Sequence, residues 1–441
     1  MYSNKTIEKP IKIKFSILEK IFLFFIGALF ILNNGLIAST ISLGYLIPVF
    51  PIGIIGQIIL IFAIPYFIFT NRIKFNLIFF LIFALNIQTI ISIILSFNDY
   101  GVWSLRSATY VADINYIFIG NLIVQNNYKR YLIPKIFWML LFIGAIYSLT
   151  IPFKGYLTAL SPTLPAFSGY DVPIFFNFIT SGLITQTFFF SESFFPIKKG
   201  NLTIKIVSIM GILVTLIFGA ARSNYFIFIF SILVTFLFGP KKFGKYSFFF
   251  LMFICTLNVF FMMGLSFSET RVSEIQDMRF FYEHFLSSFG FQSDIIGGAS
   301  GGLGQRLDWW KDALDKLFSS NINFLFGIGQ GVPLTDFVSN RAVLVKNLHN
   351  SFITILVRNG FLGFLIFFTL IFTTYKNLIH NIKAVKNDIY YSNFLKTSFL
   401  FISSILIISL MQSALEISCF AIPLYLLIGM VASYKIKPNK V

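Results

Sequence analysis

The chain has 441 residues, 57% of them hydrophobic and 12% charged, and its formal net charge is +17. This composition excludes an ordinary soluble domain, in which apolar residues make up about 45–50% of the chain. The two cysteines, Cys255 and Cys419, both lie in apolar runs and indicate neither a disulfide framework nor a metal site. The composition therefore predicts an integral membrane protein.

Apolar runs that are long enough to cross a bilayer recur along the whole chain. One crossing takes about 20 helical residues, and these runs are too continuous for the alternating strands of a membrane barrel. We therefore expect an all-α integral membrane protein with about 12 transmembrane helices, the first of which is a retained signal anchor. The expected helices are 21–38, 43–69, 75–97, 108–124, 131–153, 172–190, 202–220, 223–238, 246–267, 350–373, 397–415 and 419–433.

The basic residues follow a pattern along the chain. Most of the 34 Lys and Arg residues lie near the two ends and in every second connection between the expected helices. This is the positive-inside pattern, and it predicts that both termini are cytoplasmic. The net charge is therefore a topology signal, and no nucleic-acid partner is expected.

One large hydrophilic segment interrupts the apolar runs. We expect residues 1–267 to hold transmembrane helices 1–9, residues 268–349 to form an extracytoplasmic segment, and residues 350–441 to hold helices 10–12. Because the other connections are short, chemistry that needs many polar groups is expected in the segment 268–349.

The segment 268–349 contains two stretches with helical spacing. An amphipathic helix is expected over 269–289, and the glycine-rich stretch 297–304 that follows is expected to be too flexible for a helix. Helical spacing resumes over 305–318, and GIGQG at 327–331 is typical of a turn. The apolar face expected on the second helix consists of Leu307, Trp310, Leu314 and Leu317.

His349 and Asn350 stand where the chain re-enters the membrane. Asn350 is a natural cap for the following helix, because its side chain can accept hydrogen bonds from free backbone amides. His349 is either an interface residue that is hydrogen-bonded to a turn or a general base, a role that suits an imidazole with a pKa of about 6.5. The sequence position leaves both interpretations open.

Arginines away from the cytoplasmic connections are candidate anion ligands. Arg222 lies between two expected helices on the outer side, where an arginine is costly unless it is paired with an anion. Arg306 is close in sequence to Trp309 and Trp310, so a phosphate contact and an aromatic platform for a sugar could lie together. Further arginines of the outer segment, which ordinary salt bridges also explain, are Arg271, Arg279 and Arg341.

Two charged residues, Asp113 and Arg358, fall inside expected helices. We expect them to neutralise each other across the bundle. The outer segment contains no acidic cluster with the spacing of metal ligands, so neither a metal nor another cofactor is expected.

Three motifs occur in one order: AARS at 220–223, QRLDWWKDAL with FGIGQG between 305 and 331, and LHNSFITILVRNGFLG at 348–363. In this order they resemble the O-antigen polymerase and ligase superfamily of bacterial envelope glycosyltransferases, over roughly residues 202–373. The chain departs from the family pattern at Ser223, where a glycine is frequent, and at Arg358, where an acidic residue is common two places before the glycine.

The resemblance implies a function and a site. Family members transfer an oligosaccharide from an undecaprenyl-pyrophosphate carrier to an acceptor sugar at the outer leaflet of the bacterial inner membrane, without a nucleotide or a metal. By position, Arg222 and Arg306 would bind the pyrophosphate, and His349 would be the catalytic residue at the reacting hydroxyl. Additional substrate contacts are expected from Arg279, Trp310, Arg341 and Asn350. The implied partners are the carrier-linked oligosaccharide, membrane lipid and a chain-length regulator.

Three activities stay open. A polymerase would add carrier-linked repeats to a growing glycan, and the rather long chain without distinctive ligase features favours it. A ligase would transfer the finished glycan to the lipid A core. A polysaccharide flippase is the alternative from another class, because transporters carry charged groups such as Asp113 and Arg358 within their helices.

Overall fold

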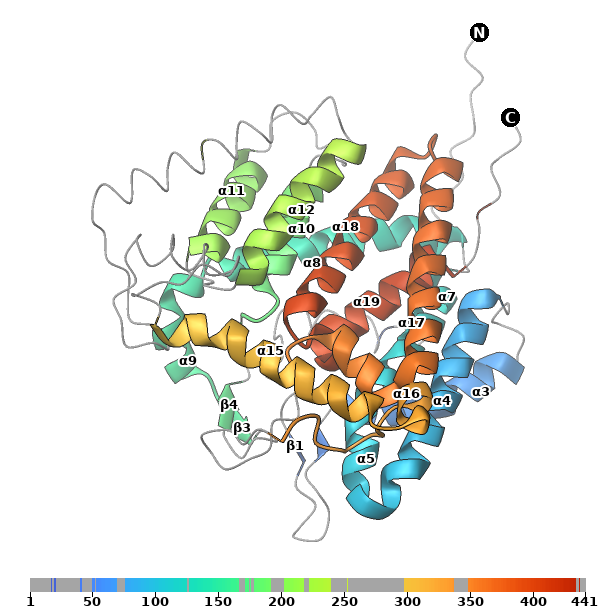
Figure 1. Cartoon of the computed structure of the whole chain (residues 1–441). Helices are drawn as coiled ribbons and strands as arrows, with labels where there is room; N and C mark the ends of the chain where they lie inside the picture. Colours follow the sequence, from blue (N-terminus) through green and yellow to red (C-terminus); the bar gives the residue numbers. More distant parts are fainter. Residues whose placement is uncertain are drawn as a thin grey trace.

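The structure is a computed structural model of the chain (Figure 1). It describes residues 53–69, 76–124, 127–165, 178–191, 202–217, 222–238, 297–336 and 348–433, with a few isolated residues and short pieces elsewhere. The described residues are helical apart from turns and two short antiparallel pairs of strands, β1 (Thr40–Ile41) with β2 (Phe50–Pro51) and β3 (Thr163–Pro165) with β4 (Asp171–Pro173).

The α-helices have the following bounds: α3 (Gly53–Phe69), α4 (Leu77–Tyr100), α5 (Val102–Ser107), α6 (Thr109–Ala112), α7 (Tyr116–Val124), α8 (Asn127–Ser148), α9 (Lys154–Leu160), α10 (Ser181–Ser191), α11 (Leu202–Ile217), α12 (Arg222–Phe238), α15 (Gly297–Phe318), α16 (Asn321–Phe326), α17 (Ser351–Ala384), α18 (Ile389–Met411) and α19 (Ser418–Val431). The described residues also form three 3₁₀ turns: η1 (Asp113–Asn115) between α6 and α7, η2 (Ile151–Phe153) between α8 and α9, and η3 (Ala414–Glu416) between α18 and α19.

Among the described residues, three helices, α4, α17 and α18, are long and apolar enough to cross a membrane. A fourth crossing is added if the pair Leu132–Ser148 and Ile151–Leu160, which is bent by 45°, counts as one span. The protein is therefore a helical multi-pass membrane protein. The full number of 12 helices stays a prediction, and the expected helices 21–38 and 246–267 lie almost entirely outside the described residues.

The expected helix 172–190 is wrong over its first half. Residues Asp171–Pro173 form strand β4, and α10 begins only at Ser181. Pro173 lacks a backbone N–H and disfavours helical geometry in the residue before it, which fits the extended backbone of β4. With 11 residues, all of them buried, α10 is a short helix inside the bundle, and a helix that is buried all round needs no polar face.

The expectation that the glycine-rich stretch 297–304 is not helical is also wrong, because this stretch forms the first turns of α15. Helix propagation from the strongly helical residues that follow explains this, since each further residue adds one backbone hydrogen bond to an existing helix. A glycine costs only about 1 kcal/mol relative to alanine in such a position. The expected helix 269–289 lies outside the described residues.

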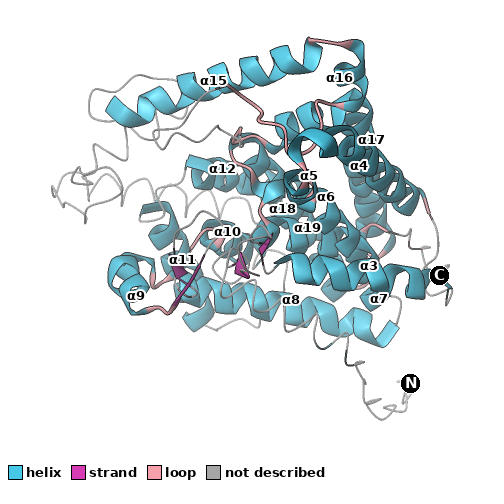
Figure 2. Ribbon diagram, turned by 90° about the horizontal axis from the view of Figure 1, so that it is seen from below, coloured by secondary structure: helices cyan, strands magenta, loops and turns pink. Residues whose placement is uncertain are grey.

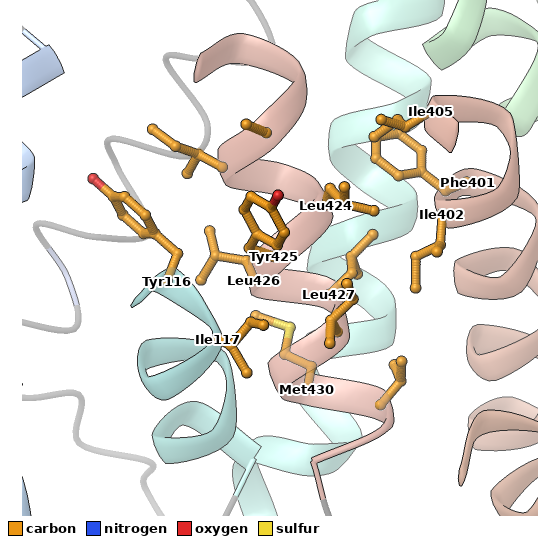
Figure 3. Close-up of a cluster of buried hydrophobic side chains, with 14 of the residues drawn as sticks. Tyr116, Ile117, Phe401, Ile402, Ile405, Leu424, Tyr425, Leu426, Leu427 and Met430 are labelled. Atoms are coloured by element: carbon orange, nitrogen blue, oxygen red, sulfur yellow. The ribbon is translucent and has the colours of Figure 1, made fainter. Parts of the chain in front are cut away.

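The core of the bundle lies where α7 and α18 pack on α19 (Figure 3). Gly120 of α7 and Gly429 of α19 lie so close that a Cβ atom on either would collide with the backbone of the other helix. Small residues allow this close approach of two membrane helices. Seen from the end of the bundle, α15 lies on one side and α8 on the other, with α18 and α19 between them (Figure 2).

Candidate functional site

α15 crosses the bundle at the end where α17 begins and α18 ends (Figure 1). Its buried face is centred on Ala313 and Leu317, which pack against Leu348 and Val357. Leu307, expected on this face, is 52% exposed, because it lies to one side of the buried stripe. Helical spacing places Arg306 on the stripe itself, seven residues before Ala313.

The Arg306 guanidinium reaches from α15 to the end of α18. Its Nη1 donates to the carbonyl oxygen of Met411, the last residue of α18, at 3.2 Å. The last carbonyls of a helix have no partner within the helix and carry partial negative charge, which a cation stabilises. Burial lowers the pKa of Arg306 from its ordinary value, but a guanidinium stays protonated in proteins.

The indole of Trp310 joins α15 to the segment that precedes α17. Its Nε1 donates to the carbonyl oxygen of Leu348 at 2.8 Å. The neighbouring Trp309 stacks on His349 with ring centroids 6.2 Å apart and an interplanar angle of 24°. The two indoles therefore fix the position of His349, and the expected sugar contact of Trp310 stays a prediction.

His349 has a left-handed backbone, with a φ of 51°, which is uncommon for a residue other than glycine. Asn350 follows as the N-cap of α17, and its side chain accepts hydrogen bonds from the backbone N–H groups of Phe352 and Ile353 at 3.0 and 3.1 Å. The expected cap is thus confirmed. The unusual φ and the cap together turn the chain sharply into the helix and hold His349 at its start.

Burial lowers the pKa of His349 below its ordinary value, and the positive charge of Arg306 lowers this pKa further. Both causes disfavour the protonated imidazolium. His349 therefore stays neutral at pH 7, the state in which an imidazole nitrogen can accept a proton.

The residues between α18 and α19, 412–417, form a connection that we call the α18–α19 linker. Ser351, the first residue of α17, contacts it twice. The Ser351 hydroxyl donates to the carbonyl oxygen of Gln412 at 3.4 Å and accepts from the backbone N–H of Leu415 at 3.1 Å. The start of α17 and the end of α18 are thereby held together next to Arg306.

The start of α12 contacts the same linker. The side-chain Nε2 of Gln412 donates to the hydroxyl oxygen of Ser223 at 3.2 Å, and Ser223 is buried. Arg222 is the first residue of α12, directly before Ser223, and its side chain lies outside the described atoms. Arg306, the start of α17 after His349 and the start of α12 after Arg222 thus come from three distant parts of the sequence to the end of α18 and the linker that follows it.

Some of the other expected site residues lie outside the residues that the structure describes. Arg271, Arg279 and Arg341 lie outside the described residues. Gln412 carries no charge and belongs to no motif, so the sequence offered no signal for its place at the site. Within the described part of the chain, no group of three or more His, Cys, Asp and Glu side chains could hold a metal ion.

The GIGQG turn (327–331) packs against a break in α17. Gly360 has a φ of 68° and a ψ of −176°, which interrupts the helix. The backbone N–H of Ile328 donates to the carbonyl oxygen of Val357 at 2.9 Å, and Gln330 Nε2 donates to Asn359 Oδ1 at 2.8 Å. The turn expected from the sequence is confirmed, and its contacts fix the first part of α17 (351–359), which follows His349 directly.

The two charged residues expected inside helices lie in different surroundings. Arg358 is 4% exposed, and both Glu416 of the linker and Tyr110 lie close enough to interact with it electrostatically. Asp113 accepts a hydrogen bond from the Ser418 hydroxyl at 2.9 Å. The mutual neutralisation of Asp113 and Arg358 stays a prediction.

The fold and the site define a class: a multi-pass helical membrane protein with a polar, arginine- and histidine-containing site at one end of its bundle. Residues 207–368 match the family model described as O-antigen ligase, and this match supports membership of the superfamily of O-antigen polymerases and ligases. The matched range includes Arg222, Arg306 and His349. The family implies glycosyl transfer in general, on lipid-linked polysaccharide substrates. A comparison with curated proteins finds no match.

Proposed function

We propose that the protein is a polysaccharide polymerase of the bacterial inner membrane, which joins undecaprenyl-pyrophosphate-linked oligosaccharide repeats at the outer leaflet. One observation supports this most directly: the guanidinium of Arg306 and the start of α12 contact the end of α18 and the α18–α19 linker, and the His349 imidazole stacks on Trp309 of the helix that carries Arg306. A cation for a diphosphate and a base for a hydroxyl are what this transfer requires.

In the proposed reaction, a hydroxyl oxygen of the acceptor sugar attacks the anomeric carbon of the donor. The bond from this carbon to the pyrophosphate oxygen breaks, and the bonding electrons leave with the pyrophosphate. Arg222 and Arg306 stabilise the negative charge that grows on the leaving group, so they bind the transition state more strongly than the ground state. The neutral imidazole of His349 takes the proton of the attacking hydroxyl.

The proposal gives the remaining candidate residues supporting roles. Arg279, Arg341, Trp310 and Asn350 would contact the substrate, with neither metal nor nucleotide taking part. The site would face the periplasm, both termini would be cytoplasmic, and a chain-length regulator would be a partner. The basic connections between the expected helices support this orientation.

A ligase is the second candidate, because the family model that matches the chain is described as O-antigen ligase. Purified protein in lipid vesicles separates the two activities. Given only carrier-linked repeats, a polymerase makes a ladder of longer glycans. Product that forms only after lipid A core is added would overturn the polymerase and support the ligase.

The family match does not favour a flippase. In the vesicle assay, glycan transport without glycan joining, unaffected by Arg306→Ala, would contradict the proposed glycosyl transfer. Loss of joining in Arg306→Ala, with unchanged protein yield and unfolding temperature, is the expected result.

A further inference from the structure

Gln412 is the residue of the α18–α19 linker whose contacts join two parts of the site. Its backbone carbonyl accepts from the Ser351 hydroxyl at the start of α17, at 3.4 Å. Its side-chain Nε2 donates to the hydroxyl oxygen of Ser223 at the start of α12, at 3.2 Å. The residue before it, Met411, accepts the hydrogen bond from Arg306.

The side-chain bond of Gln412 bridges elements that are far apart in sequence, since Ser223 and Gln412 are separated by 189 positions. Ser223 is 4% exposed, so a lost donor at this hydroxyl would not be replaced by bulk water. A buried polar group that loses its partner retains the full cost of its desolvation. The contact therefore stabilises the position of the start of α12 relative to the linker.

We propose that Gln412 is a positioning residue, which holds the start of α12, and with it Arg222, in register with Arg306 and His349. This inference rests on the proposed function, because it assumes that Arg222 and Arg306 act on one pyrophosphate. Two guanidiniums on separate elements can grip one diphosphate only if their spacing is fixed. A displacement of about 1 Å in such a constellation lowers a rate by up to about 10²-fold.

Within the described residues, the start of α12 has further polar contacts that do not involve the linker. Gln186 of α10 donates from Nε2 to the carbonyl oxygen of Asn224 at 2.9 Å. The Asn224 side chain also donates from Nδ2 to the carbonyl oxygen of Thr215 of α11 at 3.3 Å, and the Tyr225 hydroxyl donates to the carbonyl oxygen of Leu216 at 3.3 Å. These bonds keep α12 folded and packed on α10 and α11 when Gln412 is changed. Loss of the Gln412 side-chain amide should therefore shift Arg222 without unfolding the helix.

The test replaces Gln412 with methionine, which has nearly the same shape but no amide. Transfer is measured in vesicles, with the carrier-lipid fraction from cells in which the gene is deleted as donor. Gln412→Met and Ser223→Ala should each lower kcat/KM about 10-fold to 100-fold, mainly through kcat. The double variant should be no slower than either single variant, because both changes remove the same hydrogen bond.

A second cycle tests whether Gln412 acts through Arg222. In an Arg222→Lys background, Gln412→Met should lower the residual rate by less than about twofold. An equal loss with and without Arg222→Lys would overturn the inference. Ser223→Ala makes the same test from the other side of the bond if Gln412→Met does not fold.

Asn377→Leu is the matched control. The Asn377 amide also makes a buried bond between two helices, from Nδ2 to the carbonyl oxygen of Ala432 at 2.9 Å, but at the opposite end of α17. It should lower the unfolding temperature and leave kcat/KM unchanged. Wild-type kinetics in Gln412→Met, with transfer lost in Arg306→Ala, would refute the positioning role alone. Wild-type kinetics in Arg306→Ala and Arg222→Lys would refute the proposed function itself.

Discussion

Replacing Gly360 with alanine tests whether the GIGQG turn holds the first part of α17 in place. Gly360 has a φ of 68° and a ψ of −176°, a conformation that is close to exclusive to glycine. A Cβ atom on Gly360 would also collide with the backbone N of Gly327 and the backbone O of Leu325. These atoms belong to backbone that cannot rotate away, so the turn itself would have to move.

The expected loss of stability has two parts. A side chain forced into this φ and ψ region costs about 1–3 kcal/mol. Displacing the turn breaks the bond from Ile328 to Val357 and the bond from Gln330 to Asn359, at about 1 kcal/mol each. We therefore expect Gly360→Ala to lower the free energy of unfolding by about 3–5 kcal/mol.

Alanine substitutions at two other glycines allow the cost of backbone strain to be measured apart from the cost of displacing the turn. Gly101 has a φ of 52°, but a Cβ atom there would meet nothing within 4 Å, so Gly101→Ala measures backbone strain alone. Gly304 lies within α15 with nothing within 4 Å of such a Cβ, and Gly304→Ala should stabilise the helix by up to about 1 kcal/mol.

Reversible unfolding of the purified protein in mixed detergent micelles measures all three variants. Gly360→Ala should be the least stable of the three, followed by Gly101→Ala. Because the first part of α17 begins two residues after His349, glycan transfer should also fall in Gly360→Ala and not in the two controls. Equal stability of Gly360→Ala and Gly101→Ala would refute the tight packing of the turn on the helix break.

Three further predictions concern the candidate site. His349→Asn, chosen because asparagine tolerates a left-handed φ, should keep the unfolding temperature and lower transfer about 10²-fold to 10⁴-fold; a normal rate would exclude the general base. Arg222→Lys should abolish most transfer, because the ammonium keeps the charge but lacks the planar fork of donors; full activity would contradict a bidentate phosphate contact. Arg306→Gln should raise the pKa of His349, because it removes a positive charge that lowers this pKa. A base works only when unprotonated, so the acid limb of the residual pH–rate profile should then move to higher pH; an unmoved limb would show that Arg306 and His349 do not interact.

The sequence predicted those features that depend only on residues close together in the chain, such as membrane-crossing helices and helix caps. Continuous apolar runs predicted α4, α17 and α18, because the length of a membrane crossing sets the length of the run. Asn350 before an apolar run predicted the cap of α17, since a cap needs only a side-chain oxygen at the right offset.

Predictions from the sequence were wrong where packing overrides local preference. Glycines at 297–304 suggested a break, yet the helix extends through them. The apolar run 172–190 suggested one crossing, yet only its second half is helical. The break at Gly360 was not predicted, although this glycine lies within the motif LHNSFITILVRNGFLG. Its positive φ is set by the GIGQG turn that packs against it, and the local sequence does not show this packing.

The contacts at the α18–α19 linker show why the site itself could be predicted only in part. A charged residue is easily recognised in an apolar chain, so Arg306 could be selected from the sequence. Its partner could not be selected, because it is a backbone carbonyl 105 positions away. Every residue has such a carbonyl, and what distinguishes that of Met411 is its place at the end of a helix. A neutral carbonyl holds the guanidinium in position without neutralising it, and it engages one of the five N–H groups that a guanidinium carries. A carboxylate in the same place would compete with a diphosphate for the same charge. An arginine that is anchored by a helix end therefore keeps its full charge for an anionic ligand, which is the physical reason to expect the pyrophosphate here.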